Sequence, residues 1–164
     1  MKTIYLSLGS NMGDRRAHIE GALRRLPEAG VEVRRVSSLY KTEPVDVRAQ
    51  AWFVNCVVEA ATDLPPRRLL GALKALEKAL GRRPGTPKGP RPIDIDILLY
   101  ENVVVRTAEL SIPHSRMAER RFVLVPLNEL AREARDPASN RTVLEMLRET
   151  KDTSAVIRLK DGEE

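Results

Sequence analysis

The stretch Gly89-Pro-Arg-Pro-Ile-Asp-Ile-Asp-Ile-Leu-Leu-Tyr100 alternates apolar and acidic residues over its centre. Three isoleucines are separated by Asp94 and Asp96, and this period of two predicts a β-strand with one apolar face. Successive side chains of a strand point to opposite faces, so both carboxylates leave the same face, about 6.5–7 Å apart. The isoleucines would then face a core, and the aspartates would face solvent or a site.

Two carboxylates at that separation can converge on a hard cation. Magnesium is usually held by one or two carboxylates, and its other positions are left to water and substrate phosphates. Arg91 stands just before the pair and could bind a phosphate bidentately. The segment therefore indicates a metal–phosphate site, while a surface strand with two acids on its wet face fits these few residues equally well.

The bulk composition is that of an ordinary folded protein. The chain has 164 residues, 42% hydrophobic and 31% charged, which predicts one domain over 1–164. No stretch approaches the length of a membrane span, and the first residues enter a strand pattern at once, so we expect no signal peptide. Cys56 is the only cysteine, which suits a core position and a reducing compartment. We therefore expect a cytoplasmic protein.

The charge points to an anionic ligand without naming it. The formal net charge is +5, and 21 of the 28 basic residues are arginine. Such an excess suits a nucleic acid or a nucleoside triphosphate, but a GC-rich genome or a warm habitat would produce the same bias. The chain has no P-loop, and Gly9-Ser-Asn-Met-Gly13 lacks the third glycine of a dinucleotide fingerprint.

Apolar periodicity predicts the order strand, helix, strand, strand, helix, strand over the first hundred residues. The strands are expected near 4–8, 31–40, 53–61 and 93–97, and the helices near 19–26 and 66–80. The alternation of the second strand slips at Arg34-Arg35, which indicates a bulge. This order matches the ferredoxin-like split unit, an α+β sandwich with a mainly antiparallel sheet and helices on one face. The other face would be free to carry the two aspartates.

The remainder of the chain has weaker patterns. Val103-Val-Val105 follows Glu101-Asn102 and predicts a short hairpin. The region 112–130 is less regular, with a helical part expected near 116–120. A helix near 143–147 and a strand near 156–159 are expected to complete the fold.

Short pieces in order along nearly the whole chain match one enzyme family. They are Leu8-Gly-Ser-Asn-Met-Gly13, Ser37-Ser-Leu-Tyr40, Thr42-Glu-Pro44, Phe53-Val-Asn55, Glu77 with Gly81-Arg82, Gly89-Pro-Arg-Pro-Ile-Asp-Ile-Asp-Ile97, Ile112-Pro-His114 and the run from Arg120 to Pro126. With these pieces the chain resembles the 6-hydroxymethyl-7,8-dihydropterin pyrophosphokinases of folate biosynthesis. The acidic box followed by Ile112-Pro-His114 is the most specific combination.

The resemblance implies a ferredoxin-like fold, ATP as co-substrate, two Mg²⁺ ions and release of AMP. In such a reaction the substrate hydroxymethyl oxygen attacks the β-phosphorus of ATP. Catalysis would then come mainly from positioning and electrostatic stabilisation. The implied partners are small molecules, ATP and hydroxymethyl dihydropterin, with no nucleic acid and no membrane. A monomer is expected.

By the same resemblance, Asp94 and Asp96 would bind the magnesium ions, and Arg82 and Arg91 would be catalytic, contacting phosphate. The positions implied around the pterin are Thr42, Phe53, Asn55 and Phe122. The positions implied around ATP are Glu77, Ile97, Ser111, His114 and Arg120.

Side-chain chemistry agrees with several of these roles. The Asn55 amide offers donors and an acceptor to a pterin edge, and asparagine is otherwise disfavoured inside a strand. Phe53 and Phe122 are the only phenylalanines and could stack on a flat heterocycle, although buried phenylalanine is usually core. His114 could hydrogen-bond a phosphate or a ribose in either tautomer.

The segment from Arg82 to Pro92 carries four prolines and two glycines. It predicts a lid that closes over ATP and pterin by hinge motion about Gly85 and Gly89. Closure would bring Arg82 toward the phosphates, so its loss should lower kcat more than pterin affinity. Lys88 stands near the place where better-known members carry an aromatic residue.

Two other functions remain open from the residues. A ferredoxin-like nucleic-acid-binding module would suit the positive charge, but two acids on the sheet face would repel phosphates. A metal-dependent phosphohydrolase would use the same aspartates but needs more ligands and a general base for water. One assay separates the three: AMP release in the presence of ATP, magnesium and the hydroxymethyl pterin.

Overall fold

The computed structural model describes residues 1–45, 49–82 and 91–161. Its centre is an antiparallel sheet built around β1 (Lys2–Ser10), which lies between β4 (Phe53–Thr62) and β5 (Asp94–Tyr100). The strand order is β5-β1-β4-β3-β8, and β2 also pairs with β4. The outer strands are β2 (Val31–Val36), β3 (Tyr40–Thr42) and β8 (Val156–Arg158). This is the predicted ferredoxin-like arrangement.

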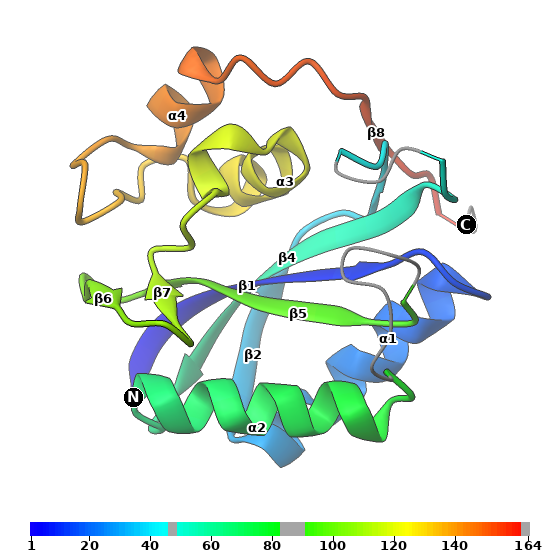
Figure 1. Cartoon of the computed structure of the whole chain (residues 1–164), viewed down its shortest axis with the longest axis horizontal. Coiled ribbons are helices and arrows are strands. Elements are labelled where there is room, and N and C mark those ends of the chain that lie inside the picture. Colours follow the sequence, from blue (N-terminus) through cyan, green and yellow to red (C-terminus); the bar gives the residue numbers. More distant parts are fainter. Residues whose placement is uncertain (46–48, 83–90, 162–164) are drawn as a thin grey trace.

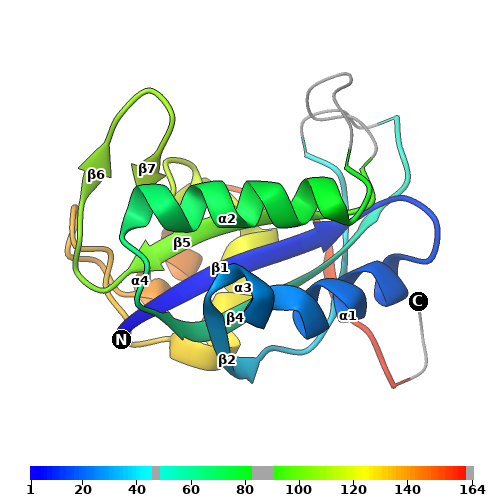
Figure 2. The same cartoon turned by 90° about the horizontal axis from the view of Figure 1, so that it is seen from below.

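Helices α1 (Arg15–Arg25) and α2 (Pro66–Ala79) cover one face of the sheet, with the short turn η1 (Leu26–Ala29) after α1 (Figure 1). Figure 2 shows both helices running beside β1 and β5. Asp14 caps the start of α1, and α2 begins at Pro66, where a missing N–H costs nothing. Gly81, at φ +100°, ends the second helical segment as expected. The alternate residues of β1, β4 and β5 meet these helices in the main core.

The opposite face is only partly open, so the expectation of a free face is wrong in part. Helices α3 (Arg121–Ala131) and α4 (Val143–Glu149) pack over one end of it (Figure 1). A second apolar cluster forms there because Val57 and the bulged pair Leu98 and Leu99 point toward α3. The uncovered end of this face carries the two aspartates.

Several local predictions are confirmed and others are wrong. The register of β2 shifts between Val33 and Arg35, as the slipped alternation indicated. The hairpin is misplaced: β6 (Val105–Arg106) pairs with the later β7 (Ser111–Ile112). Helix α3 was not predicted because Pro126 lies inside it, and its buried apolar side chains outweigh that local cost.

The remaining short helical elements are η2 (Met117–Glu119), near the helical part expected at 116–120, and α4 at its expected place. The predicted lid lies mostly on residues 83–90, outside the described residues, as does Lys88. In the described part of the chain, no helix has the length and apolarity needed to cross a membrane.

Candidate active site

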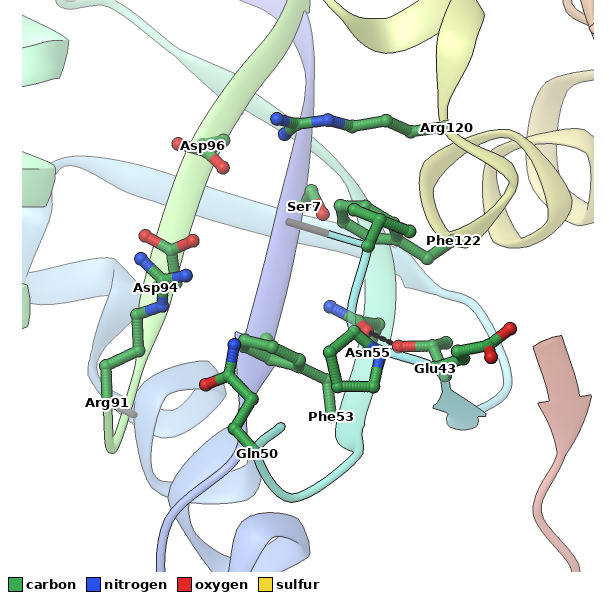
Figure 3. A pocket seen from close by; sticks show the side chains of 14 residues that line it. Ser7, Glu43, Gln50, Phe53, Asn55, Arg91, Asp94, Asp96, Arg120 and Phe122 are labelled. Atoms are coloured by element: carbon green, nitrogen blue, oxygen red, sulfur yellow. Dashed lines mark hydrogen bonds between the residues drawn. The ribbon is translucent and has the colours of Figure 1, made fainter. Parts of the chain in front are cut away.

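Two cavities meet at the acidic pair of β5. The first, here called the aromatic cavity, opens on the uncovered sheet face (Figure 3). It is lined by Ser7, Gly9, Thr42, Glu43, Pro44, Val45, Gln50, Phe53, Asn55, Arg91, Asp94, Asp96, Arg120 and Phe122. Flat apolar rings and a few convergent polar groups are typical of a small-molecule site.

The second, here called the polar cavity, lies on the other side of β5, between α2 and the β6–β7 hairpin. It is lined by Leu70, Lys74, Glu77, Arg82, Asp94, Ile95, Asp96, Ile97, Thr107, Ala108, Glu109, Leu110, Ser111, His114 and Ser115. Asp94 and Asp96 line both cavities. A group bound in either cavity would therefore face the same two carboxylates.

Sheet register explains the placement of the acids. Asp94 pairs with Gly9 and Asp96 pairs with Ser7, so both carboxylates stand beside small residues of β1. Ile95 points the opposite way into the main core. The period-two prediction of a shared acidic face is confirmed.

Arg82 is already bonded to one member of the acidic pair, Asp94, and to Glu77. Its Nη1 donates to Asp94 Oδ1 at 2.5 Å and to Glu77 Oε2 at 2.9 Å. Glu77 is buried, and its Oε2 also accepts the Ile95 backbone N–H at 2.6 Å. Burial raises the pKa of Glu77, against the opposing effects of the Ile95 hydrogen bond and Arg82. Glu77 is therefore not an ordinary exposed acid of a helix surface.

Asp96 is in a different electrostatic state. Burial raises its pKa to about 7, and the nearby carboxylates of Asp94 and Glu77 add to the shift. Arg120 and Arg82 oppose it. A carboxylate that is costly to ionise beside a second acid is stabilised by a cation.

The two carboxylates suit magnesium, which keeps water and phosphate ligands, better than a metal held entirely by protein side chains. Over residues 1–45, 49–82 and 91–161, no group of three or more His, Cys, Asp or Glu side chains is arranged to hold a metal. Two carboxylates facing two cavities leave the other coordination positions to water and a phosphate ligand, as magnesium prefers.

Two neutral polar groups of the aromatic cavity, Thr42 and Asn55, are bonded to each other. The Thr42 hydroxyl donates to Asn55 Oδ1, and Asn55 Nδ2 lies 3.5 Å from the Leu8 carbonyl oxygen. Asn55 is only 4% exposed. Its amide lies directly over Gly9, where any Cβ would overlap Nδ2. The amide is therefore held in one orientation before any ligand binds.

Two arginines lie against the two aromatic rings. Arg91 Cζ is 5.5 Å from the Phe53 ring centroid, and Arg120 Cζ is 5.5 Å from that of Phe122. Figure 3 shows these residues around the same cavity. Arg91 Nε is buried and has no hydrogen-bond partner among the described residues. Such a donor is suited to an anionic ligand.

All thirteen predicted site residues line at least one of the two cavities, although their roles stay predictions. Arg120, expected near ATP, lines the aromatic cavity instead of the polar one. Ser111 Oγ accepts from Arg106 and is 3.3 Å from the Pro113 carbonyl oxygen. Burial, and secondarily Arg120, lowers the pKa of His114, which favours a neutral imidazole.

Sequence reasoning missed several lining residues, including Ser7, Gly9 and Gln50. The alternation of β1 could have placed Ser7 and Gly9 on one face, because both stand two residues apart in a strand. Nothing local indicates Gln50, which precedes β4 and lies in an irregular segment.

The chain resembles known proteins in sequence. The family model described as 7,8-dihydro-6-hydroxymethylpterin-pyrophosphokinase (HPPK) matches residues 5–132. A 2-amino-4-hydroxy-6-hydroxymethyldihydropteridine pyrophosphokinase of Bacillus subtilis is 42% identical over 137 residues, which are 83% of this chain and 82% of that protein. A mitochondrial folate synthesis bifunctional protein of Pisum sativum is 46% identical over 127 residues, 77% of this chain.

These relatives differ in how much of their length the chain covers. The chain spans 25% of the length of the pea protein but 82% of the Bacillus subtilis enzyme. A solved structure of wild-type Plasmodium falciparum HPPK-DHPS has a TM-score of 0.70 at 16% identity. The match covers 90% of this chain and 44% of that one, and it supports the fold alone.

Proposed function

This chain belongs to the 7,8-dihydro-6-hydroxymethylpterin-pyrophosphokinase family, and we propose that it transfers the pyrophosphoryl group of ATP to 6-hydroxymethyl-7,8-dihydropterin, releasing AMP. The observation that carries the proposal is the acidic pair shared by two cavities. A two-substrate transfer needs its charged centre between the sites of donor and acceptor, and Asp94 and Asp96 stand there.

The aromatic cavity is the proposed pterin site. Phe53 and Phe122 offer ring faces for stacking, and the held amide of Asn55 offers hydrogen bonds to the pterin edge. Thr42 fixes that amide. A rigid neutral wall of this kind suits a flat, neutral heterocycle, because little conformational entropy is lost on binding.

The polar cavity is the proposed ATP site, lined by Glu77, Ile97, Ser111 and His114. Arg82 faces it and Arg91 faces the pterin side, so the two guanidinium groups approach the acidic pair from different cavities. Arg120, on the pterin side, can reach the transferred phosphates only at their junction with the acceptor.

The residues divide the work of the reaction. The pterin wall aims the hydroxymethyl oxygen at the β-phosphorus, and the polar cavity holds the triphosphate in line with it. The arginines stabilise the negative charge that spreads over phosphate oxygens as AMP leaves. Asp94 and Asp96 would hold magnesium, which supplies neutralisation of the phosphate oxygens when bound.

Further features belong to the same proposal. We propose two magnesium ions, because two carboxylates shared between two cavities can serve one ion on each side. We also propose that the protein is a monomer. The single cysteine, Cys56, is buried, which accords with a reducing cytoplasm, and residues 1–164 would form one pyrophosphokinase domain.

The test is product analysis with purified protein, ATP, magnesium and 6-hydroxymethyl-7,8-dihydropterin. AMP and a pyrophosphorylated pterin in equal amounts are expected. Release of ADP, release of phosphate without pterin modification, or no turnover would contradict the proposal. Hydrolysis of ATP in the absence of pterin would favour the phosphohydrolase alternative.

A further inference from the structure

Asn11 follows the last residue of β1, and none of the roles above assigns it a task. Its side chain is polar, yet it is only 4% exposed. Buried amides are retained where their hydrogen bonds are made, because an unpaired one is costly. The partners of Asn11 therefore indicate its purpose.

On one side Asn11 extends the contact between β1 and β5. The β1–β5 ladder ends where Gly9 pairs with Asp94. Pro92 has no N–H, so an ordinary ladder cannot continue through it. Asn11 bridges the gap: its backbone N–H donates to the Arg91 carbonyl oxygen at 3.2 Å, and its Oδ1 accepts the Arg91 backbone N–H at 2.8 Å. Arg91 is thereby held at both backbone groups.

On the other side Asn11 extends the contact between β1 and β4. That ladder ends where Ser10 pairs with Val54. Asn11 Nδ2 donates to Gln50 Oε1 at 2.7 Å and lies 3.5 Å from the Ala51 carbonyl oxygen. Gln50 lines the aromatic cavity, and residues 50–52 lead directly into Phe53, the first residue of β4.

The two segments that Asn11 connects are also in contact through Arg91 and Phe53. Arg91 places its guanidinium 5.5 Å from the Phe53 ring, over the same cavity. We propose that Asn11 is a positioning residue, which sets Arg91 relative to the Phe53 wall and so aligns the phosphate-binding guanidinium with the pterin acceptor. This inference rests on the proposed function.

Only an amide meets both sides with one side chain. It has an acceptor for the Arg91 N–H and donors for Gln50 and Ala51. Alanine has neither, so the Asn11→Ala variant would break both connections. The Gln50→Ala variant breaks only the connection toward the pterin wall and keeps the Arg91 connection.

The experiment measures single-turnover AMP formation in wild type, Asn11→Ala, Gln50→Ala and the double variant. Pterin affinity is measured separately with oxidised 6-hydroxymethylpterin by its fluorescence. We expect Asn11→Ala to slow the transfer about 10- to 100-fold, since small misplacements of reacting groups have effects of that size. Pterin affinity should change less than about threefold, because Thr42 and Gly9 hold Asn55 independently of Asn11.

The double variant should be little slower than Asn11→Ala, because Asn11 and Gln50 share one hydrogen bond. Hydrogen exchange of the Arg91 amide should be faster in Asn11→Ala and unchanged in Gln50→Ala. Thr62→Val is the matched control: its buried hydroxyl donates to the Gly30 carbonyl oxygen at the far end of β4. It should lower thermal stability and leave the transfer rate unchanged.

A transfer rate of Asn11→Ala within about twofold of wild type would overturn the inference. So would an equal slowing in Thr62→Val, since both effects would then reflect stability alone. If Asn11→Ala does not fold, a Gln50→Ala variant with the wild-type transfer rate overturns the inference by itself. Failure of the proposed function is distinguishable, because wild type itself would then release no AMP.

Discussion

The two cavities that share Asp94 and Asp96 are prepared for their ligands in opposite ways. In the aromatic cavity the wall around Asn55 is neutral, and Thr42 and the Leu8 carbonyl hold the Asn55 amide. In the polar cavity the bonded groups are ionisable, and Arg82 donates to both Asp94 and Glu77. Without a ligand, the Asn55 amide of the aromatic cavity is therefore already oriented. In the polar cavity, the charged groups pair with one another instead.

The difference follows from the energetics of neutral and charged groups. A neutral amide can be buried and kept rigid when its hydrogen bonds are made within the protein. For the carboxylates, burial and then the neighbouring acids raise the pKa of Asp96, and Asp94 pairs with the cation Arg82. The aromatic cavity should therefore respond to steric changes and the polar cavity to charge changes.

Removing either acid should produce the largest effect. We expect Asp94→Ala and Asp96→Ala each to lower kcat at least about 1000-fold, because a metal ligand serves the transition state directly. The fold should survive, as judged by circular dichroism. Asp63→Ala, at an exposed acid near the N-terminus, is the control and should keep full activity. More than about a tenth of wild-type kcat in either active-site variant would refute the metal assignment.

Adding a single methyl group beside Asn55 should weaken pterin binding without weakening ATP binding. Gly9→Ala places a Cβ on Asn55 Nδ2, and Phe53 leaves little room to relax. We expect pterin affinity to fall about 10- to 100-fold, since the amide must leave its oriented position. ATP affinity, measured by calorimetry with a non-hydrolysable analogue, should stay near wild type. Gly71→Ala, where a Cβ meets open space, is the matched control. Equal losses of both ligands would mean general disruption of β1.

Removing the Arg82 partner of Asp94 should raise the affinity of the polar cavity for a divalent cation. Arg82→Gln removes the guanidinium that competes for Asp94. Without ATP, affinity for Mn²⁺ as a magnesium substitute should rise about 3- to 10-fold, measured by electron paramagnetic resonance of the free ion. At the same time kcat should fall, because Arg82 no longer serves the phosphates. Arg25→Gln, which loses only a surface pair with Glu28, should change neither quantity. Weaker Mn²⁺ binding in Arg82→Gln would show that Arg82 supports the metal site.

The smallest effect concerns pH. The pKa of Asp96 is about 7 in the folded protein, above its ordinary value of 3.8. The folded state therefore holds a proton that the unfolded state has lost, so this group lowers stability as pH rises between those values. Without divalent cations, Asp96→Asn should raise Tm relative to wild type by about 2–4 °C above pH 7, and the gain should vanish near pH 4. A gain of the same size at both pH values would rule out titration of Asp96 as its source.

Local pattern was sufficient for much of the fold and for the acidic pair. The period of two in β5 placed Asp94 and Asp96 on one face, and leucines at helical spacing gave α2. Local pattern failed at α3, where Pro126 and β-branched residues argue against a helix. Packing of Val123, Leu124 and Leu127 on the second core cluster decides in favour of the helix there.

Away from the bulges, the amino-acid sequence was therefore enough to show which residues share a face, because side-chain direction follows the local backbone period. The tertiary structure alone decided which faces meet. It brought Asn11 to Arg91 and Thr42 to Asn55, placed Arg82 on Asp94, and set one acidic pair between two cavities. These are contacts between segments whose relative position depends on strand order, register and the packing of the whole core, and no local periodicity encodes them.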